Sequence, residues 1–345
     1  MSTDANNTSF FMNAQAAGFG TCTAQDELLH RELNTGLTDP ALTETQFMGF
    51  SVPEANIHSL CYAWAHPTLR TLTGGVWAWQ GIKNSALASE MFDMRQYMDF
   101  TPLDTGDFDD LRMPSGYRVR CLVPLEKFHI SYSDPQRRNA FDVTLTAIMP
   151  PAVLPSGRHL DQAMRTEGSL LLRGRAYDVN GYTVRDRSWG ENRTEEPRNA
   201  PPIHWLTGVF GDDLAFHLMG VEHPSHNPIW RDIYPIDDSV AEATNRGWIW
   251  TEGELREVHA ASVRTRWDTN TGYPLAHEVA FTDSTGREYA ITGTVTASNN
   301  WSAWSNAFFG ISLARWEYAG RTGWGDSQIG AWTDFVHALS SRTVG

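Results

Sequence analysis

In Phe141–Met149, an alternation of apolar and polar residues that runs up to Ala147 is the feature that most restricts how this sequence folds. Phe141, Val143 and Leu145 are apolar, and the residues between them are aspartate and threonine. Because successive side chains of a strand point to opposite faces, this period of two predicts a half-buried β-strand and excludes a helix. Phe128–Tyr132 has the same period, and the proline-containing segment between the two runs predicts a hairpin.

Short strands of the same texture continue toward the C-terminal end. Turn residues separate them, as in the Asp283–Gly286 loop between two alternating runs. Helical periodicity is confined to Ala24–Arg31, Leu160–Thr166 and Ile329–Leu339. Many short strands at close spacing predict an all-β sandwich or barrel architecture with few short helices. The further predicted strands are Tyr117–Pro124, Gly168–Asp178, His204–Phe210, Leu214–Val221, Gly247–Thr251, Ser262–Trp267, His277–Phe281, Arg287–Val295 and Ile311–Tyr318.

The length of 345 residues predicts about two domains. The best boundary is Met149–Gly157, whose prolines cannot lie inside a central strand. The sequence therefore predicts a first domain over residues 1–157 and a second over residues 158–345. Residues 1 to about 45 are polar and irregular, which predicts an N-terminal arm ahead of the first β unit.

Charge and composition exclude several classes of function. The 41 acidic and 27 basic residues give a net charge of −14, which argues against binding to nucleic acid or an anionic membrane. No run approaches the roughly 20 apolar residues of a membrane span, and no signal peptide is visible. Cys22, Cys61 and Cys121 form no CxxC pair and are expected to be free thiols in a reducing compartment. We therefore expect a soluble cytoplasmic protein.

The densest polar and aromatic cluster is Gly181–Gly190. Arg185, Asp186 and Arg187 stand just before Trp189. A carboxylate between two guanidiniums stays ionised, which suits an acceptor for a substrate hydroxyl or a group that stabilises a developing cation. A structural ion pair closing a barrel end, with Trp189 packed beneath it, explains the same residues and is the commoner arrangement.

Two histidines in predicted strands are candidate acid or base groups. His204 begins one strand, and His217 lies between two apolar residues of the next. A lone histidine in an apolar strand is more often a hydrogen-bonded core residue, but one that lines a cavity is a natural general acid or base near neutral pH. His223 and His226 lack a third ligand at suitable spacing, so no metal is predicted. Nucleotide-binding and GxSxG motifs are also missing, so no cofactor is predicted.

The chain contains 14 Trp residues, more than two small cores demand. Such rings are ordinary barrel core, but they also suit a cavity for a hydrophobic ligand and can stabilise a carbocation through their faces. The surplus favours a cavity. The late members of the set are Trp248, Trp250, Trp267, Trp301, Trp304, Trp316 and Trp324.

Taken together, Gly181, Arg185–Gly190 and the later Trp205 resemble the AttH/carotenoid 1,2-hydratase (hydroxyneurosporene synthase-like) superfamily. The resemblance covers residues 160–330 well and the N-terminal half only loosely. Further stretches resemble uncharacterised bacterial members of the superfamily, namely Phe210–Leu214, Gly247–Trp250 and Glu317–Gly325.

The resemblance implies two lipocalin-like antiparallel β-barrels packed side by side, with a ligand pocket near their junction. Relatives include cofactor-free carotenoid hydratases, pericyclases that perform intramolecular Diels–Alder cyclisations, and isoprenoid cyclases or isomerases. The aspartate of the hydratase Tyr-x-Asp pair matches Asp186, but Val184 stands at the tyrosine position. The hydratase His-x-Trp pair finds only His159 followed by Asp161. The resemblance therefore implies the superfamily without implying carotenoid hydration.

These observations predict a cofactor-independent lyase or isomerase of the hydratase, dehydratase, cyclase or pericyclase type. Its substrate is a hydrophobic isoprenoid-like or polycyclic small molecule held in an aromatic-lined pocket, where orientation alone supplies roughly 7–11 kcal/mol. The alternative is a lipocalin-like binding protein without catalysis, and the chain is expected to be a monomer or a homodimer. The predicted catalytic residues are Asp186, His217 and His204, and the predicted substrate-binding residues are Arg185, Arg187, Trp189, Trp205 and Trp250.

Overall fold

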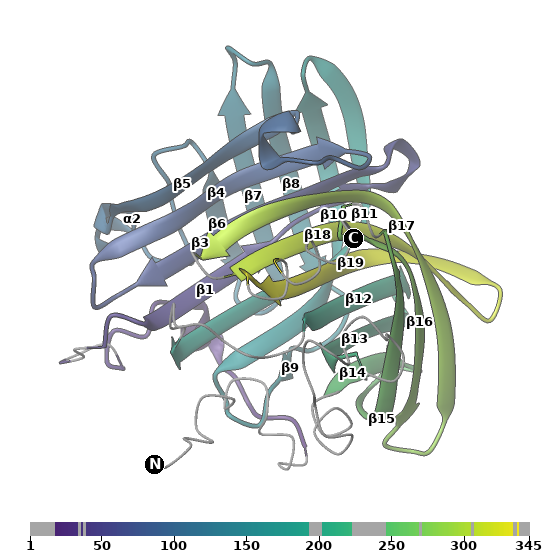
Figure 1. Ribbon diagram of the computed structural model, residues 1–345. Coiled ribbons are helices and arrows are strands. Elements are labelled where there is room, and N and C mark those ends of the chain that lie inside the picture. Colours follow the sequence, from purple (N-terminus) through teal and green to yellow (C-terminus); the bar gives the residue numbers. More distant parts are fainter. Residues whose placement is uncertain are drawn as a thin grey trace. The chain divides into compact units, whose positions relative to one another are not determined.

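Two compact units make up the chain in a computed structural model that describes residues 18–33, 36, 39–192, 202–222, 246–268, 271–304, 307–333 and 337 (Figure 1). The N-terminal unit consists of Phe19–Thr194 together with Gly211–Asp213. The C-terminal unit consists mainly of Glu195–Phe210 and Leu214–Gly345. None of the helices in the described part of the chain has the length and apolar character needed to cross a membrane.

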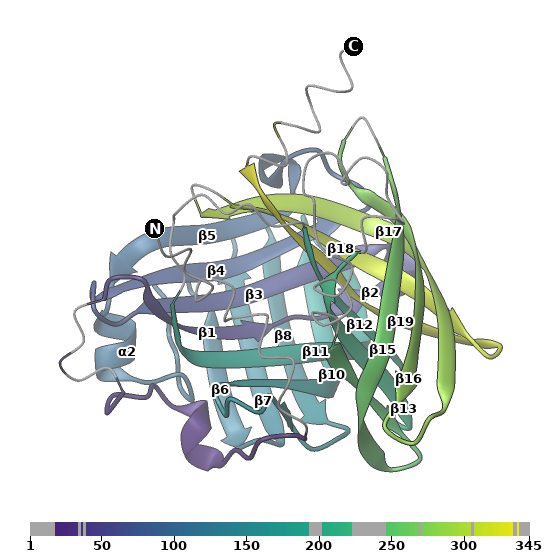
Figure 2. The same cartoon turned by 60° about the horizontal axis from the view of Figure 1, so that its bottom comes forward.

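The N-terminal unit is built on one antiparallel sheet. Its strands are β1 (Leu42–Met48), β2 (Ser51–Val52), β3 (Ile57–His66), β4 (Thr71–Gln80), β5 (Met91–Asp99), β6 (Arg118–Val123), β7 (Lys127–Asp134), β8 (Asn139–Ala147), β9 (Ala152–Val153), β10 (His159–Leu172) and β11 (Arg175–Asn192). The order is β5-β4-β3-β1-β11-β10-β8-β7-β6, while β2 pairs with β3 and β9 with β10. Figure 2 shows β5, β4, β3 and β1 side by side. The helical segments are η2 (Ala24–Glu27), η3 (Pro53–Ala55), η4 (Ala86–Ala88) and α2 (Thr101–Thr105).

Alternation along these strands builds the core of the N-terminal unit. On β8, Val143 and Leu145 are fully buried and Asp142 is exposed, which confirms the pattern seen in the sequence. The connection between β5 and β6, the two edge strands, adds Leu103 and Phe108 to the same core. Side chains of this connection therefore cover the core between the two edge strands, which are not joined by backbone hydrogen bonds. The sheet is open, whereas the resemblance implied a closed barrel.

The C-terminal unit is a closed antiparallel barrel. Its strands are β12 (Ile203–Gly211), β13 (Leu214–Val221), β14 (Arg246–Thr251), β15 (Glu254–Trp267), β16 (Pro274–Asp283), β17 (Glu288–Trp304), β18 (Ala307–Tyr318) and β19 (Arg321–Trp332). Figure 1 shows the long strands β15–β19 in green to yellow. Closure removes free sheet edges, so the barrel needs no covering element to satisfy its backbone groups. The all-β, lipocalin-like fold predicted from the sequence is confirmed.

The boundary between the units does not lie at the proline-rich segment. β10 pairs with β8, and β11 pairs with β1, so His159–Asn192 is part of the N-terminal sheet. The compact units divide between Thr194 and Glu195 instead of at Gly157. The prolines of this segment flank the two-residue strand β9 and do not interrupt a central strand, so they mark an edge of the sheet and not the end of a domain.

The structure differs from the sequence in the three segments predicted to be helical. The prediction of a helix at Leu160–Thr166 is wrong, because these residues lie in β10 between two partner strands. Ala24–Arg31 is partly correct, since Ala24–Glu27 forms one turn of 3₁₀ helix capped by Thr23. Ile329 continues strand β19, and most of the segment after Trp332 lies outside the described residues. A residue with an apolar neighbour at i+4 satisfies both helix and strand periodicities, so short runs mislead.

Candidate functional site

Strands β10 and β11 bring two aspartates and a histidine together on one face of the N-terminal sheet. Asp161 lies directly opposite Asp186 in the antiparallel register, and His159 lies opposite Ser188. The ligand atoms of His159, Asp161 and Asp186 all lie within 4.8 Å of one another. The imidazole Nε2–H of His159 donates to Oδ1 of Asp161 at 3.2 Å. We call these three residues the acid cluster.

Burial gives the acid cluster an inner and an outer part. His159 and Asp161 are 5% and 1% exposed, whereas Asp186 is only partly buried. Asp186 is therefore the member that a substrate could reach, and the other two lie behind it. A partly exposed carboxylate backed by a buried hydrogen-bonded pair is a suitable arrangement for a general base.

Electrostatics set the charge of the acid cluster. Burial by itself lowers the pKa of His159, but the carboxylates of Asp161, Asp186 and Glu191 outweigh it and raise this pKa to about 9. His159 is consequently a cation at neutral pH. Its charge offsets the repulsion that two directly opposed carboxylates would otherwise suffer in the sheet.

The same sheet face continues into strand β1 with hydroxyl and aromatic groups. Phe47 pairs with Asp186, and Thr45 pairs with Ser188, whose hydroxyls share a hydrogen bond of 2.6 Å. The ring of Tyr62 on β3 lies 6.5 Å from that of Phe47. Asp186 thus lies between a polar side, formed by Asp161, and an apolar side, formed by Phe47.

The two arginines that flank Asp186 point to the opposite face of the sheet, because successive strand residues alternate. Arg185 is fully buried, donates bidentately to Glu27 at 2.7 and 3.0 Å, and lies 4.3 Å over the Phe128 ring. Arg187 donates to Glu44 at 2.8 Å. The expectation that these arginines hold the Asp186 carboxylate is therefore wrong. They bind acidic side chains of the N-terminal segment and of β1.

Trp189 is on the arginine face as well. It is 3% exposed and stacks on His30, with 4.6 Å between the ring centroids. It also packs with Val153 and Leu160. Trp189 therefore anchors the N-terminal segment next to Arg187 and does not line the face that carries Asp186.

The other predicted site residues lie in the C-terminal barrel. His217 pairs with Trp248 across β13 and β14, and its ring lies 5.1 Å from that of Trp205. These residues point away from the barrel core, which contains the neighbouring Phe216, and Trp250 lies two residues further along the same face. His204 alternates with Trp205 and is fully buried. The structure thus groups His217 with Trp205, and it separates both from His204.

Metal binding by the acid cluster is possible by spacing alone, but the protonation state opposes it. A metal ligand must be a neutral imidazole, whereas the two aspartates keep His159 protonated through the neutral range. The histidine pair considered from the sequence, His223 and His226, lies outside the described residues.

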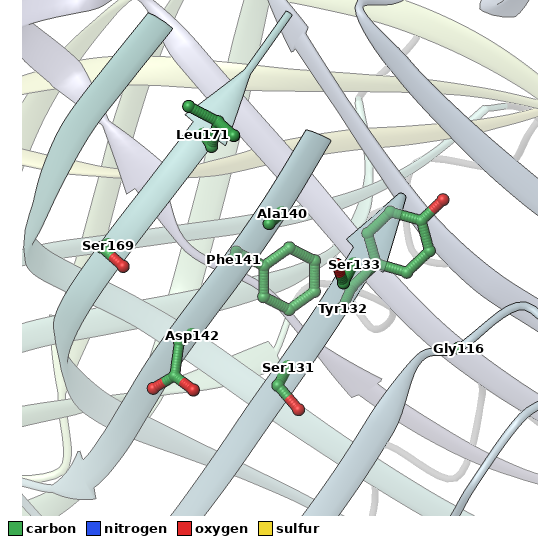
Figure 3. A pocket seen from close by; sticks show the side chains of 9 residues that line it. All are labelled: Gly116, Ser131, Tyr132, Ser133, Ala140, Phe141, Asp142, Ser169 and Leu171. Atoms are coloured by element: carbon green, nitrogen blue, oxygen red, sulfur yellow. The ribbon is translucent and has the colours of Figure 1, made fainter. Parts of the chain in front are cut away.

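A separate depression of about 360 Å³ lies on the N-terminal sheet (Figure 3). Figure 3 shows it lined by small and aromatic side chains of β7, β8 and β10, among them Ser131, Tyr132 and Ser169. Its one carboxylate, Asp142, already accepts from His129 at 3.0 Å. The depression therefore contains fewer side chains that could transfer a proton near neutral pH than the acid cluster does.

Sequence reasoning missed the partners that give Asp186 its setting. The sequence analysis named His159 and Asp161 only as a poor match to the hydratase His-x-Trp pair. The helical interpretation of Leu160–Thr166 did not place the two residues on one face of a strand beside Asp186. The acidic partners Glu27 and Glu44 were missed because they belong to the first 45 residues, which were interpreted as an N-terminal arm with one short helix. Only the register of β10, β11 and β1 shows which of these residues meet.

Comparison with known proteins assigns the family. The model of a family described as "Domain of unknown function (DUF7064)" matches residues 23–334. The chain belongs to this family. The match includes the N-terminal half, where the resemblance seen in the sequence was loose. No curated protein matches the chain in sequence.

Solved structures share the fold. Kievitone hydratase from Nectria haematococca is 12% identical with a TM-score of 0.51, covering 94% of this chain and 98% of that chain. An AttH-like protein from Nitrosomonas europaea is 14% identical with a TM-score of 0.53, covering 93% and 98%. CghA is 9% identical with a TM-score of 0.57, covering 93% and 96%. At such identities the similarity establishes the fold, which is the one that the superfamily resemblance implied.

Proposed function

We propose that this protein is a lyase or isomerase that transfers protons on a hydrophobic small molecule at the acid cluster. The observation that carries the proposal is the pair of opposed carboxylates, Asp161 and Asp186, with the buried His159 cation beside them. One of the structures with this fold is a hydratase by name, which is consistent with chemistry of the same kind.

Asp186 takes the role of general base, because it is the accessible carboxylate. In an isomerisation, it removes a proton from one carbon of the substrate, and the electron pair shifts along the conjugated system. The acid proton of Asp186 exchanges with solvent, and Asp186 then delivers a proton to another carbon. In a dehydration, the electron pair of the broken C–H bond forms a C=C bond, and the hydroxyl leaves as water with the proton that Asp186 has taken up. Neither sequence needs an electron acceptor or a cofactor.

The substrate class follows from what surrounds Asp186. Phe47 is 2% exposed and lies opposite Asp186 on β1, with Tyr62 beyond it. An apolar body packed on these rings would bring an acidic C–H or a hydroxyl to the carboxylate. A hydrophobic isoprenoid-like or polycyclic molecule meets that requirement. Holding it in one orientation contributes to catalysis independently of proton transfer.

The test is mass spectrometry of products formed in D₂O and, separately, in H₂¹⁸O. Purified full-length protein is incubated with a panel of terpenoid, steroid, polyene and phenylpropanoid compounds, with boiled protein as the blank. Solvent-derived deuterium at carbon or ¹⁸O in a product supports the proposal. Asp186→Asn is expected to lower the rate by about 10²–10⁴-fold, the usual contribution of a general base.

The matched control is Asp178→Asn, because Asp178 is an exposed aspartate of the same strand. It should leave the rate unchanged. A rearranged product without solvent label, formed equally well by Asp186→Asn, would instead identify an enzyme that works by substrate shape alone. Tight retention of a compound without any conversion would refute catalysis and favour the lipocalin-like carrier.

A further inference from the structure

The depression on the N-terminal sheet contains a row of three polar side chains (Figure 3). Ser131 on β7 and Ser169 on β10 each lie directly opposite Asp142 on β8. Side chains opposite each other on neighbouring strands lie about 5 Å apart, so the Asp142 carboxylate has a hydroxyl on either side. All three side chains are at least partly exposed, and a ligand can therefore reach them. We call Ser131, Asp142 and Ser169 the polar row.

A less polar row of side chains lies beside the polar row. Ala140 is two residues from Asp142 on β8, so both side chains are on the same face of the sheet. Ser133 on β7 and Leu171 on β10 lie opposite Ala140. Two residues of a strand span roughly 7 Å, which is the spacing of the two rows. The depression thus has hydrogen-bonding groups at one end and the apolar surface of Ala140 and Leu171 at the other.

Two further side chains hold the Asp142 carboxylate in position. Nδ1 of His129 lies 3.1 Å from Nη2 of Arg120, and Nε2 of His129 lies 3.0 Å from Oδ1 of Asp142. A guanidinium can only donate, so Arg120 donates to Nδ1, and the imidazole keeps its proton on Nε2 and donates it to Asp142. This chain of hydrogen bonds occupies Oδ1. The other carboxylate oxygen, Oδ2, has no hydrogen-bond partner within the described residues.

The serine hydroxyls of the depression are open to a ligand as well. Ser131, Ser133 and Ser169 form no hydrogen bond through their side chains in the described part of the chain. The depression has a volume of about 360 Å³, which lies in the range of small-molecule sites. Carboxylate and hydroxyl oxygens accept hydrogen bonds, and a primary ammonium group supplies up to three N–H donors. The polar row therefore matches an ammonium group in its hydrogen-bonding character.

The charges around the polar row also favour a cation. Arg118, which lies opposite Ser131, donates to Oδ1 of Asp110 at 2.9 and 3.1 Å. Arg120 is engaged with His129. Both basic residues of β6 thus have partners, and the chain as a whole carries a net charge of −14. An anionic ligand would be repelled by Asp142, whereas a cationic ligand would find an acceptor of opposite charge.

We propose that the depression is a binding site for a small organic cation, which consists of a primary ammonium group and a short apolar body. The ammonium group donates to Oδ2 of Asp142 and to a flanking serine hydroxyl. The apolar body lies over Ala140 and Leu171. The proposal does not depend on the function proposed for the acid cluster, because the two sites have no residue in common.

Suitable probes are 2-phenylethylamine, 2-phenylethanol and phenylacetate, because they are similar in shape and carry a cation, a neutral hydroxyl and an anion. Their affinities for the full-length protein are measured by saturation-transfer NMR titration at neutral pH. At low salt, the amine should bind about fivefold more tightly than the alcohol, which is the upper value for an exposed ion pair. Phenylacetate should bind more weakly than the alcohol. High salt should reduce the preference for the amine, because it screens the exposed charges.

Variants of the depression locate the effect. Asp142→Asn should remove the preference for the amine and leave the affinity for the alcohol unchanged. Ala140→Phe fills the depression and should abolish the binding of both. Glu278→Gln, which changes an exposed glutamate of β16, should leave all affinities unchanged and controls for the overall negative charge.

Three results would overturn the proposal. They are the absence of binding by the amine, equal affinities of the amine and the alcohol for the wild-type protein, and a preference for the amine that survives in Asp142→Asn. If Ala140→Phe does not fold, Asp142→Asn still decides the matter, because the Asp142 side chain is 72% exposed and its replacement disturbs no core packing.

Discussion

The charge of His159 is predicted to depend on Asp161. The perturbation is Asp161→Asn, which keeps the size of the side chain and removes its charge. In the wild-type protein, the pKa of His159 is raised to about 9 in spite of burial. Without Asp161, one of the carboxylates that stabilise the imidazolium is gone, and the hydrogen bond at 3.2 Å no longer has an ionised acceptor.

The size of the effect can be judged from the other buried imidazoles of this chain. Burial without a dominating carboxylate lowers the pKa of His204 and His277 to about 3. His159 is just as inaccessible, so its carboxylates account for the whole difference between about 3 and about 9. Losing Asp161 and keeping Asp186 should bring the pKa of His159 to about 6.5 or lower. That change corresponds to a loss of about 3 kcal/mol in the stability of the imidazolium.

The assay is a pH titration of ¹⁵N-labelled histidine side chains by NMR, with the His159 signal assigned from its loss in His159→Gln. The Asp178→Asn variant is the control, since Asp178 is exposed. A His159 midpoint within half a pH unit of the wild-type value in Asp161→Asn would refute the electrostatic coupling.

Three further predictions concern stability. The folded-state pKa of His159 lies above the ordinary value of 6.5, so the stabilisation by the imidazolium is complete below pH 6.5 and is lost as the pH rises through 9. Urea denaturation should show this loss of unfolding free energy, on the order of 3 kcal/mol, in the wild-type protein and should not show it in His159→Gln. Glu27→Leu removes the carboxylate that pairs with the fully buried Arg185 guanidinium, so thermal unfolding of the N-terminal unit should reveal a cost of about 3–5 kcal/mol, and adding Arg185→Met should restore most of it. A double variant less stable than the single one would contradict this reasoning. Gly293→Ala places a Cβ 2.4 Å from the buried Trp316 ring, and calorimetry should show a destabilisation of about 1–3 kcal/mol, whereas unchanged stability would mean that the ring can move aside.

The strands of the C-terminal barrel were predictable from sequence because local rules decide them. Leu214–Val221 and Gly247–Thr251 are short, apolar and bounded by turn residues, and the structure places β13 and β14 there. The strands between Leu42 and Asp99 were not predicted. β3 and β4 are buried on both faces over most of their length, so their residues do not alternate in polarity and a period of two does not show.

The candidate site was predictable only in part, for a different reason. Asp186 stood out because charged residues surround it in the sequence, but its true neighbours are remote in the chain. His159 and Asp161 approach it through the register of β10 on β11, and Phe47 through that of β1. The flanking arginines, adjacent in sequence, are separated from it by the sheet itself. Sequence proximity therefore drew attention to Asp186 but indicated the wrong neighbours for it.

Strand β11 carries side chains with a different role on each face of the N-terminal sheet. The odd-numbered residues Arg185, Arg187 and Trp189 bind the N-terminal segment on one face of the sheet, with Arg187 donating to the Leu28 carbonyl. The even-numbered Asp186 faces the other side, next to Asp161. Because the backbone of β11 links the two faces, losing an arginine would shift Asp186 without touching its carboxylate. Such a variant should lose activity together with stability, whereas Asp186→Asn should lose activity alone, and this difference separates the role of the arginines from that of the carboxylate.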